Sequence, residues 1–174
     1  MNKKIILFSI IFLWIAIAAV MVISKQHTLK TGRIAVLETV PVDPRDFLRG
    51  DYVTLRYKIN RLYLNQLNSE KAFYNSGEVI YVKLEPKGKF YEAVAVQTKK
   101  SIDNGLYIRG RIRYNYGKSA EVTYGIESYF VAEGEGQDIE RSMRGSKSSV
   151  SVEVVIDSSG AAMIKKVYAE NPGI

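Results

Sequence analysis

Carboxylate and guanidinium side chains alternate in one short stretch of the chain, where they could form a ligand-binding or catalytic site. Asp43, Asp46 and Asp51 lie close together in the sequence and could form a carboxylate pair or bind a metal ion. Three arginines are interleaved with these carboxylates, namely Arg45, Arg49 and Arg56. Because neighbouring carboxylates and guanidinium groups form charge-assisted ion pairs, we interpret the stretch as a structural turn and predict no metal site there.

One serine is a candidate nucleophile. Ser142-Met143 is similar to the nucleophile motif of signal peptidases, and the segment Arg49 to Val53 is similar to their Gly-Asp-hydrophobic strand. Such proteases join an N-terminal anchor to an exported β domain and activate the serine with a lysine of lowered pKa. The proline that follows their serine motif is missing here, and Ser142 comes after the Gly-Asp segment rather than before it. A signal-peptidase-like serine hydrolase, or a degenerate relative of one, therefore stays an alternative.

The small numbers of histidine and cysteine residues exclude several kinds of catalytic and metal site. The chain has no cysteine, which excludes a thiol nucleophile and cysteine-based zinc sites. His27 is the only histidine, so a histidine-based metal centre is excluded and a Ser-His-Asp triad is not credible. We expect no cofactor.

A row of arginines could bind a polyanion. Arg109, Arg111 and Arg113 alternate with apolar residues and therefore share one face of a predicted strand, with Tyr107 beside them. The arginine charges and the tyrosine ring on such a face could bind an acidic polymer along its length. A solvent-facing basic strand without a specific ligand is the alternative.

The segment Ile5 to Ile23 has no charged side chain and is apolar on all sides. At a rise of about 1.5 Å per residue it spans about 28 Å, close to the hydrocarbon core of a bilayer. Lys3 and Lys4 before it, with Ala16-Ile17-Ala18 inside it, also fit a cleavable signal peptide. The apolar run continues beyond Ala18, so we predict a retained transmembrane anchor.

Both alternatives export the rest of the chain. We expect residues 1–4 on the cytoplasmic side, a transmembrane anchor over 5–23, a polar juxtamembrane linker over 24–32 and an extracytoplasmic domain over 33–174. With Lys3 and Lys4 on the inner side, the exported part keeps 23 of the 25 basic residues against 18 acidic ones, a net charge of +5, which favours contact with anionic lipid head groups or envelope polymers. Nucleic acid is not an expected ligand of an exported domain.

The exported part is predicted to be mainly β. The expected strands are Ile34 to Val40, Asp51 to Ile59, Glu78 to Leu84, Phe90 to Thr98, Leu106 to Tyr116, Glu121 to Val131, Ser149 to Asp157 and Ala161 to Tyr168. Short glycine-bearing turns separate several of them. The spacing in Arg61 to Phe73 and in Gln137 to Arg144 suits short helices. We therefore predict an antiparallel barrel or sandwich of about eight strands with two short helical insertions, preceded by one transmembrane helix.

The most distinctive passage runs from Pro41 to Tyr57. Its prolines, aspartates and glycine predict a rigid turn that leads into a strand. On that strand, alternation places Val53, Leu55 and Tyr57 on one face.

This passage resembles the GDYXXLXY family. The defining string is matched by Gly50, Asp51, Tyr52, Leu55 and Tyr57. The segment Gly125 to Gly134 is also similar to the family, except that Ala132 stands where we expect a proline. The resemblance implies a bacterial protein anchored in the cytoplasmic membrane, without an established activity, and a multi-pass membrane protein as partner.

Together these features predict a non-enzymatic, membrane-tethered binding or scaffold module. We expect its contact with a partner to use the segment Asp43 to Tyr57. The binding or motif residues of this hypothesis are Asp43, Arg45, Asp46, Arg49, Gly50, Asp51, Tyr52, Leu55 and Tyr57.

Overall fold

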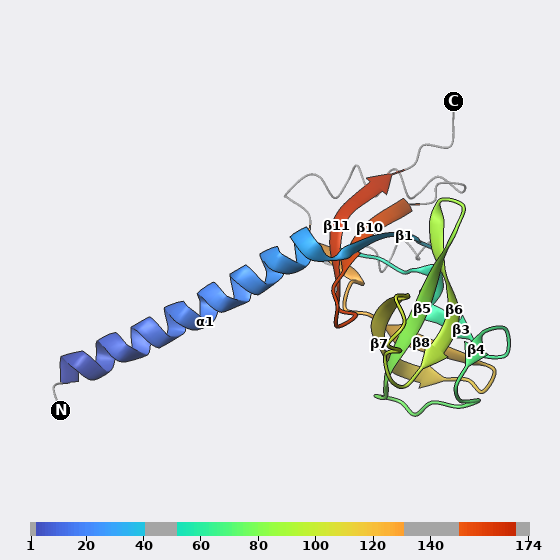
Figure 1. Cartoon of the computed structure of the whole chain (residues 1–174), viewed down its shortest axis with the longest axis horizontal. Helices are drawn as coiled ribbons and strands as arrows, with labels where there is room; N and C mark the ends of the chain where they lie inside the picture. Colours follow the sequence, from blue (N-terminus) through green and yellow to red (C-terminus); the bar gives the residue numbers. More distant parts are fainter. Residues whose placement is uncertain (1–2, 41–51, 131–149, 170–174) are drawn as a thin grey trace. The chain divides into compact units, whose positions relative to one another are not determined.

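The computed structural model of the chain describes residues 3–40, 52–130 and 150–169. The chain divides into two compact units, Met1–Gly32 and Arg33–Ile174. The first contains the helix α1 (Lys3–Thr31), and the second contains the β-strands (Figure 1).

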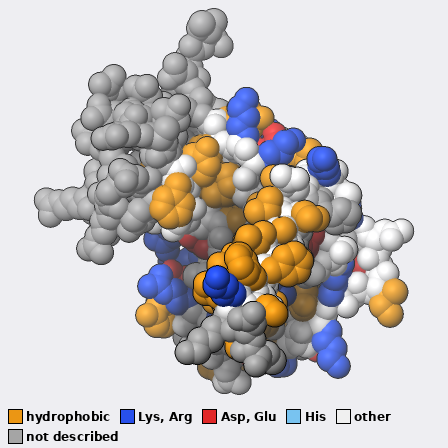
Figure 2. Space-filling model, turned by 90° about the vertical axis from the view of Figure 1, so that its left-hand side faces the viewer, with side chains coloured by type: hydrophobic (Ala, Val, Ile, Leu, Met, Phe, Trp, Pro, Cys, Tyr) orange, Lys and Arg blue, Asp and Glu red, His pale blue; other side chains and the backbone are white. Residues whose placement is uncertain are grey.

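Helix α1 is long and apolar enough to cross a membrane, judged by its length and composition. Its large side chains are exposed on every side, as Phe12 at 73% and Trp14 at 68% illustrate. Figure 2 shows hydrophobic side chains exposed to solvent in a space-filling view. A helix that is apolar all round suits a lipid environment better than the surface of a soluble core.

The helix continues through Ser24–Thr31, where the polar sequence led us to expect a linker. Adding a residue to an existing helix forms one further hydrogen bond, and this segment contains no proline or glycine to stop it. Gly32 follows the helix and donates its backbone N–H to the Thr28 carbonyl at 2.9 Å. The change from apolar to polar sequence therefore does not end the helix.

The largest sheet of the second unit has six strands and the form of a half-barrel (Figure 1). Its order is β3 (Arg61–Tyr63), β8 (Ser119–Thr123), β7 (Leu106–Asn115), β5 (Val79–Lys87), β6 (Phe90–Gln97) and β4 (Asn68–Ser69). The pairing of β4 with β6 is parallel, and the other pairs of this sheet are antiparallel. Strand order in this sheet departs from chain order, so periodicity alone could not have predicted it.

Two smaller sheets join distant parts of the chain. The three-stranded sheet has the order β1 (Arg33–Glu38), β10 (Val150–Ile156) and β11 (Ala162–Ala169). The two-stranded sheet pairs β2 (Tyr52–Thr54) with β9 (Ser128–Phe130). One buried cluster draws on all three sheets and includes Leu37, Val53, Ile108 and Val154. The prediction of a mainly β domain is confirmed, with a strand number that roughly fits.

The predicted helix over Arg61 to Phe73 is wrong. This segment holds β3 and β4, joined by turns, and a short 3-10 helix, η1 (Lys58–Asn60), precedes it. Leu62 and Leu64 are buried while their neighbours in sequence are exposed, which is the two-residue period of a strand. The second predicted helix, Gln137 to Arg144, lies outside the described residues.

Two predicted strands are interrupted. The first, Asp51 to Ile59, gives way to an isolated bridge between Thr39 and Tyr57 and then to η1. The second, Glu121 to Val131, is divided into β8 and β9 at Gly125, whose φ is +80°. Because side chains at such a φ crowd the backbone, glycine is the residue suited to this turn.

Candidate functional site

The described parts of the two strings that resemble the GDYXXLXY family, residues 52–57 and 125–130, lie side by side in space. Strand β2 pairs with β9, so that Val53 is opposite Tyr129. Beyond the ladder, the Leu55 N–H donates to the Glu127 carbonyl at 2.8 Å. The first string therefore packs against the second, although about seventy residues of sequence separate them.

Tyr57, the last residue of the defining string, is 1% exposed. Its hydroxyl donates to the Ile126 carbonyl at 2.7 Å, and its backbone N–H donates to Oδ1 of Asn60. Burial raises the pKa of Tyr57 far above the ordinary value, and the negative charge of Glu127 adds to this effect. The phenol is therefore held in its protonated, donating form.

Asn60 and Glu127 complete a buried polar network around this tyrosine. The Asn60 amide donates to the Val122 carbonyl at 2.8 Å and to Oε1 of Glu127 at 3.0 Å. The Glu127 carboxylate also accepts the backbone N–H of Tyr124 at 2.6 Å and that of Gly125 at 2.9 Å. These bonds fix the turn at Gly125 against η1.

Some motif residues thus have a structural role. Leu55 is 1% exposed, like Tyr57, so neither side chain offers a surface to a partner. Tyr52 belongs to β2. The remaining predicted site residues of this passage lie outside the described part of the chain, and they are Asp43, Arg45, Asp46, Arg49, Gly50 and Asp51.

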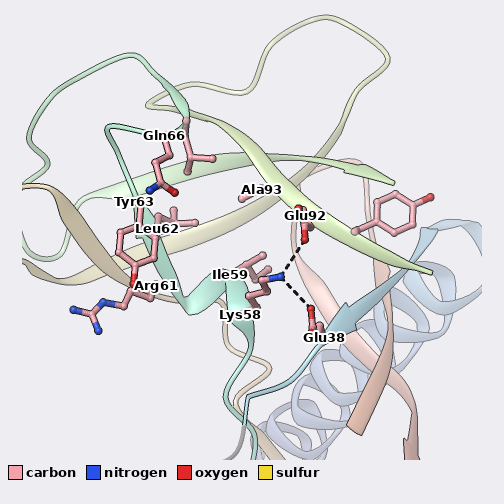
Figure 3. Close-up of a pocket in the computed structure, with 11 residues that line it drawn as sticks. Glu38, Lys58, Ile59, Arg61, Leu62, Tyr63, Gln66, Glu92 and Ala93 are labelled. Atoms are coloured by element: carbon pink, nitrogen blue, oxygen red, sulfur yellow. Dashed lines mark hydrogen bonds and ion pairs between the residues drawn. The ribbon is translucent and has the colours of Figure 1, made fainter. Parts of the chain in front are cut away.

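Next to this network lies a cleft of about 240 Å³ (Figure 3). Residues of β1, η1, β3 and β6 and of the turn after β3 surround it, and we call it the η1 cleft. Its lining is Glu38, Lys58, Ile59, Arg61, Leu62, Tyr63, Gln66, Leu67, Tyr91, Glu92 and Ala93. The apolar members supply most of the exposed surface inside it, and charged side chains stand at its rim.

Lys58 connects two strands across the rim of the η1 cleft. Its Nζ lies 3.1 Å from Oε1 of Glu92 and 3.3 Å from Oε2 of Glu38, as the dashed lines in Figure 3 show. The hydrogen bond with Glu92, followed by that with Glu38, raises the pKa of Lys58. Hydrogen bonds from Lys87 and then from Lys58 lower the pKa of Glu92. Lys58 and Glu92 therefore stay charged near neutral pH.

Lys58 is not suited to act as a general base. A lysine that acts as a general base needs a lowered pKa, whereas the pKa of Lys58 is raised. The described residues contain no group of three metal-ligating side chains. The proposed nucleophile Ser142 lies outside the described residues, so the hydrolase alternative stays a prediction.

Sequence reasoning did not find the η1 cleft. Its walls come from three separate parts of the sequence, at Glu38, between Lys58 and Leu67, and between Tyr91 and Ala93. No spacing connects Glu38 with Lys58 or Glu92. Only the position of Lys58, directly after the motif residue Tyr57, could have drawn attention to it. Asn60 was missed because its role depends on contacts with Val122 and Glu127.

The predicted arginine row exists on β7. Arg109, Arg111 and Arg113 are all exposed. Tyr107, which we expected beside them, is 2% exposed, and the exposed aromatic residue near the row is Tyr114. A bulge between Ile112 and Tyr114 shifts the register and places the Arg113 guanidinium 5.4 Å from the centre of the Tyr114 ring.

Comparison with known proteins gives one family. No curated protein and no solved structure matches the chain. The family model described as GDYXXLXY protein matches residues 14–167, which covers both strings, the η1 cleft and the arginine row. The chain therefore belongs to the GDYXXLXY family.

Proposed function

We propose that the protein is a membrane-tethered, extracytoplasmic binding module, and that its η1 cleft receives an apolar side chain from an integral membrane partner. The observation that carries this proposal is the η1 cleft itself, which combines an apolar interior with a charged rim. Anchoring side chains at protein interfaces are typically apolar or aromatic and fill such hollows, while polar groups at the rim exclude water.

The size of the η1 cleft supports a side chain as its occupant. Pockets for drug-sized ligands and cofactors have volumes of about 300–1,000 Å³. A volume of about 240 Å³ is smaller than this range and is suited to a single large side chain. Tyr63 is 47% exposed at the edge of the η1 cleft and would extend the contact beyond it.

The rim of the η1 cleft favours a partner segment of mixed polarity. Lys58 and Arg61 provide positive charge, and Glu38 and Glu92 provide negative charge. Because Lys58 already bridges both carboxylates, the rim offers little net charge to attract a strongly charged ligand. An apolar anchor flanked by neutral polar residues fits this surface better than an acidic or a basic peptide.

Helix α1 supports the choice of a membrane partner. It is apolar enough to cross a bilayer, and a tether of this kind would confine the domain to the membrane surface. Confinement raises the effective concentration of other proteins in the same membrane, so weak contacts become sufficient. We propose that the domain lies on the outer side of a bacterial cytoplasmic membrane. The resemblance of its motif to the GDYXXLXY family implies the same location.

Photo-crosslinking in intact membranes tests this proposal. Tyr63 and Tyr116 are both exposed tyrosines, but only Tyr63 lines the η1 cleft, so each is replaced in turn by benzoylphenylalanine. We expect an adduct with a multi-pass membrane protein from position 63 and none from position 116. Mass spectrometry should place the crosslink on an extracytoplasmic loop of that protein.

A variant that fills the η1 cleft completes the test. Ala93 is half-buried and lines the η1 cleft, so Ala93→Phe should occupy the space and remove the adduct from position 63. Circular dichroism of the purified variant checks that the fold is retained. Adducts that persist in a folded Ala93→Phe variant, or that form equally from both positions, would reject the η1 cleft as the binding site.

A further inference from the structure

A second hollow, of about 460 Å³, opens where β8 stops pairing with β7. The pair Arg111 and Thr123 lies at this end of the ladder, and the chain then turns away through Tyr124 and Gly125. We call this space the arginine hollow. Its lining is Val79, Tyr81, Arg109, Gly110, Arg111, Thr123, Tyr124 and Gly125.

The wall of the arginine hollow is held in place by close packing. A Cβ at Gly110 would lie 2.4 Å from Cγ1 of Val122 and 2.9 Å from Cε1 of Tyr124. Tyr124 can therefore pack against β7 only because residue 110 is glycine. Its hydroxyl donates to the Ile59 carbonyl at 2.8 Å, which fixes the ring from the other end.

Two arginines line the arginine hollow from the same strand face. Arg109 and Arg111 are separated by one residue, so their Cα atoms are about 7 Å apart along the strand. Among the described residues of β7, Arg113 forms an ion pair, in which its Nη1 lies 3.9 Å from Oε1 of Glu121. Arg111 donates one hydrogen bond to the Gly77 carbonyl at 2.8 Å.

The nearby loop after β10 carries one carboxylate, that of Asp157. Burial opposes its ionisation, but hydrogen bonds from Ser159 and Ala161, and then the positive charge of Arg109, lower its pKa, so one negative charge lies beside the arginine hollow. Oδ1 of Asp157 already accepts the backbone N–H groups of Ser159 at 2.8 Å and of Ala161 at 3.0 Å. Gly160 lies against β7, where its carbonyl accepts the Arg109 N–H at 2.8 Å. Lys100 donates to the Ser158 carbonyl on the same loop, so a further cation lies close by.

We infer that the arginine hollow binds a phosphate group carried by a small ester such as a glycerol phosphate. Each guanidinium can donate a pair of parallel hydrogen bonds to a phosphate, and the tetrahedral anion has enough oxygens for both arginines. A carboxylate has two oxygens in one plane, which a single arginine fills. The volume of the arginine hollow leaves room for the esterified alcohol beside the phosphate.

This binding goes beyond the proposed docking function. The arginine hollow and the η1 cleft have no lining residue in common. The phosphate could belong to a free ester or to the head group of an anionic lipid, since both present a phosphate group with anionic oxygens, a monoester in the first and a diester in the second. The experiment below separates these two sources.

The test uses the full-length protein in nanodiscs of phosphatidylcholine, titrated with glycerol 1-phosphate in a calorimeter. We expect saturable binding that weakens as the salt concentration rises. Arg109→Gln and Arg111→Gln should each weaken binding on the order of tenfold, because each removes charge-assisted hydrogen bonds. Arg113→Gln removes the same charge from the same strand outside the arginine hollow and should leave binding unchanged.

A second type of variant keeps both arginines. Val79 is 37% exposed, lines the arginine hollow and is paired in register with Arg111. Val79→Glu therefore places a carboxylate beside the proposed phosphate position and should abolish binding. Circular dichroism confirms that each variant is folded.

The outcomes are distinct. Absence of glycerol 1-phosphate binding, or an equal loss in Arg113→Gln, would overturn the inference, because the effect would then be absent or would reflect net charge. Selective loss in the hollow variants supports it. In nanodiscs that also contain phosphatidylglycerol, reduced binding of glycerol 1-phosphate identifies the lipid head group as a source, and unchanged binding identifies the free ester.

Discussion

Replacing Tyr57 with phenylalanine removes one hydroxyl from the buried network and keeps the ring. The hydroxyl is the donor to the Ile126 carbonyl at 2.7 Å, so the carbonyl is left without this bond in the variant. Losing a buried hydrogen bond while leaving one partner behind costs about 1.5 kcal/mol. For a domain of this size the melting temperature should fall by about 3–6 °C.

The same substitution should have the opposite effect at high pH. Burial, with a smaller contribution from Glu127, raises the pKa of Tyr57 far above its ordinary value of 10.0. The unfolded chain therefore loses this proton above about pH 10 while the folded chain keeps it, which favours unfolding by about 1.4 kcal/mol per pH unit. The stabilisation from Tyr57 is fully present below about pH 10 and is lost as the pH rises further.

These two effects predict a crossing point. Below about pH 10 the wild type should be more stable than Tyr57→Phe by about 1.5 kcal/mol. At about pH 11 the penalty for burying the tyrosine has reached about 1.4 kcal/mol, so the two proteins should be equally stable. Above that pH the phenylalanine variant should be the more stable one, because it has no proton to lose.

Urea unfolding of the full-length protein in a non-ionic detergent, followed by near-ultraviolet circular dichroism, measures this difference as a function of pH. Tyr63→Phe is the matched control, because it removes the same hydroxyl from a tyrosine that is 47% exposed and lies outside the polar network of Tyr57. Other groups that titrate contribute equally to both proteins and cancel in the difference. A difference that stays constant between about pH 8 and pH 12 would refute the burial of the Tyr57 phenol.

Four further substitutions probe this part of the domain by urea unfolding. Asn60→Ala should cost about 3 kcal/mol, because it leaves the Val122 carbonyl and other buried groups of the network unpaired; a cost below that of one hydrogen bond would contradict the network. Gly125→Ala should cost roughly 1–2 kcal/mol, because its φ of +80° is unfavourable although nothing lies within 4 Å of the added Cβ. Gly110→Ala should cost roughly 3 kcal/mol through its overlap with Val122, so equal effects at the two glycines would be inconsistent with the packing. Lys58→Met should change stability by at most about 1 kcal/mol, because its side chain is 54% exposed, and a larger loss would mean that its ion pairs are less hydrated than the structure indicates.

Local patterns in the sequence predicted much of the fold. The alternation in Leu106–Tyr116 and in Ser149–Asp157 placed β7 and β10 to within a residue or two, because one face of each strand is buried. The alternation of buried and exposed residues on β7 ends at Tyr114, since a bulge at Arg113 changes the register and exposes this tyrosine. A bulge depends on the partner strand, and its position cannot be taken from one strand alone.

The error at Arg61 to Phe73 has a different cause. Leu64 and Leu67 are three residues apart, which suits a helix, while Leu62 and Leu64 have the spacing of a strand. Pairing of Arg61–Tyr63 with β8 decides between these patterns, because the ladder hydrogen bonds and the burial of Leu62 favour the strand. Long-range pairing of this kind also brings Glu38, Lys58 and Glu92 together, and for that reason the η1 cleft could not be predicted from local sequence.

The pairing of β1 has a consequence for synthesis of the chain. Arg33 in β1 is opposite Ile156 in β10, so the first strand of the domain depends on one of its last. At about 5–20 residues per second, a ribosome needs roughly 6–25 s to extend the chain from one to the other. During this interval Ala35 and Leu37, which are fully buried in the finished domain, have no β10 ladder to join. The emerging chain is therefore exposed to aggregation for many seconds and should depend on a holding chaperone until β10 has left the ribosome.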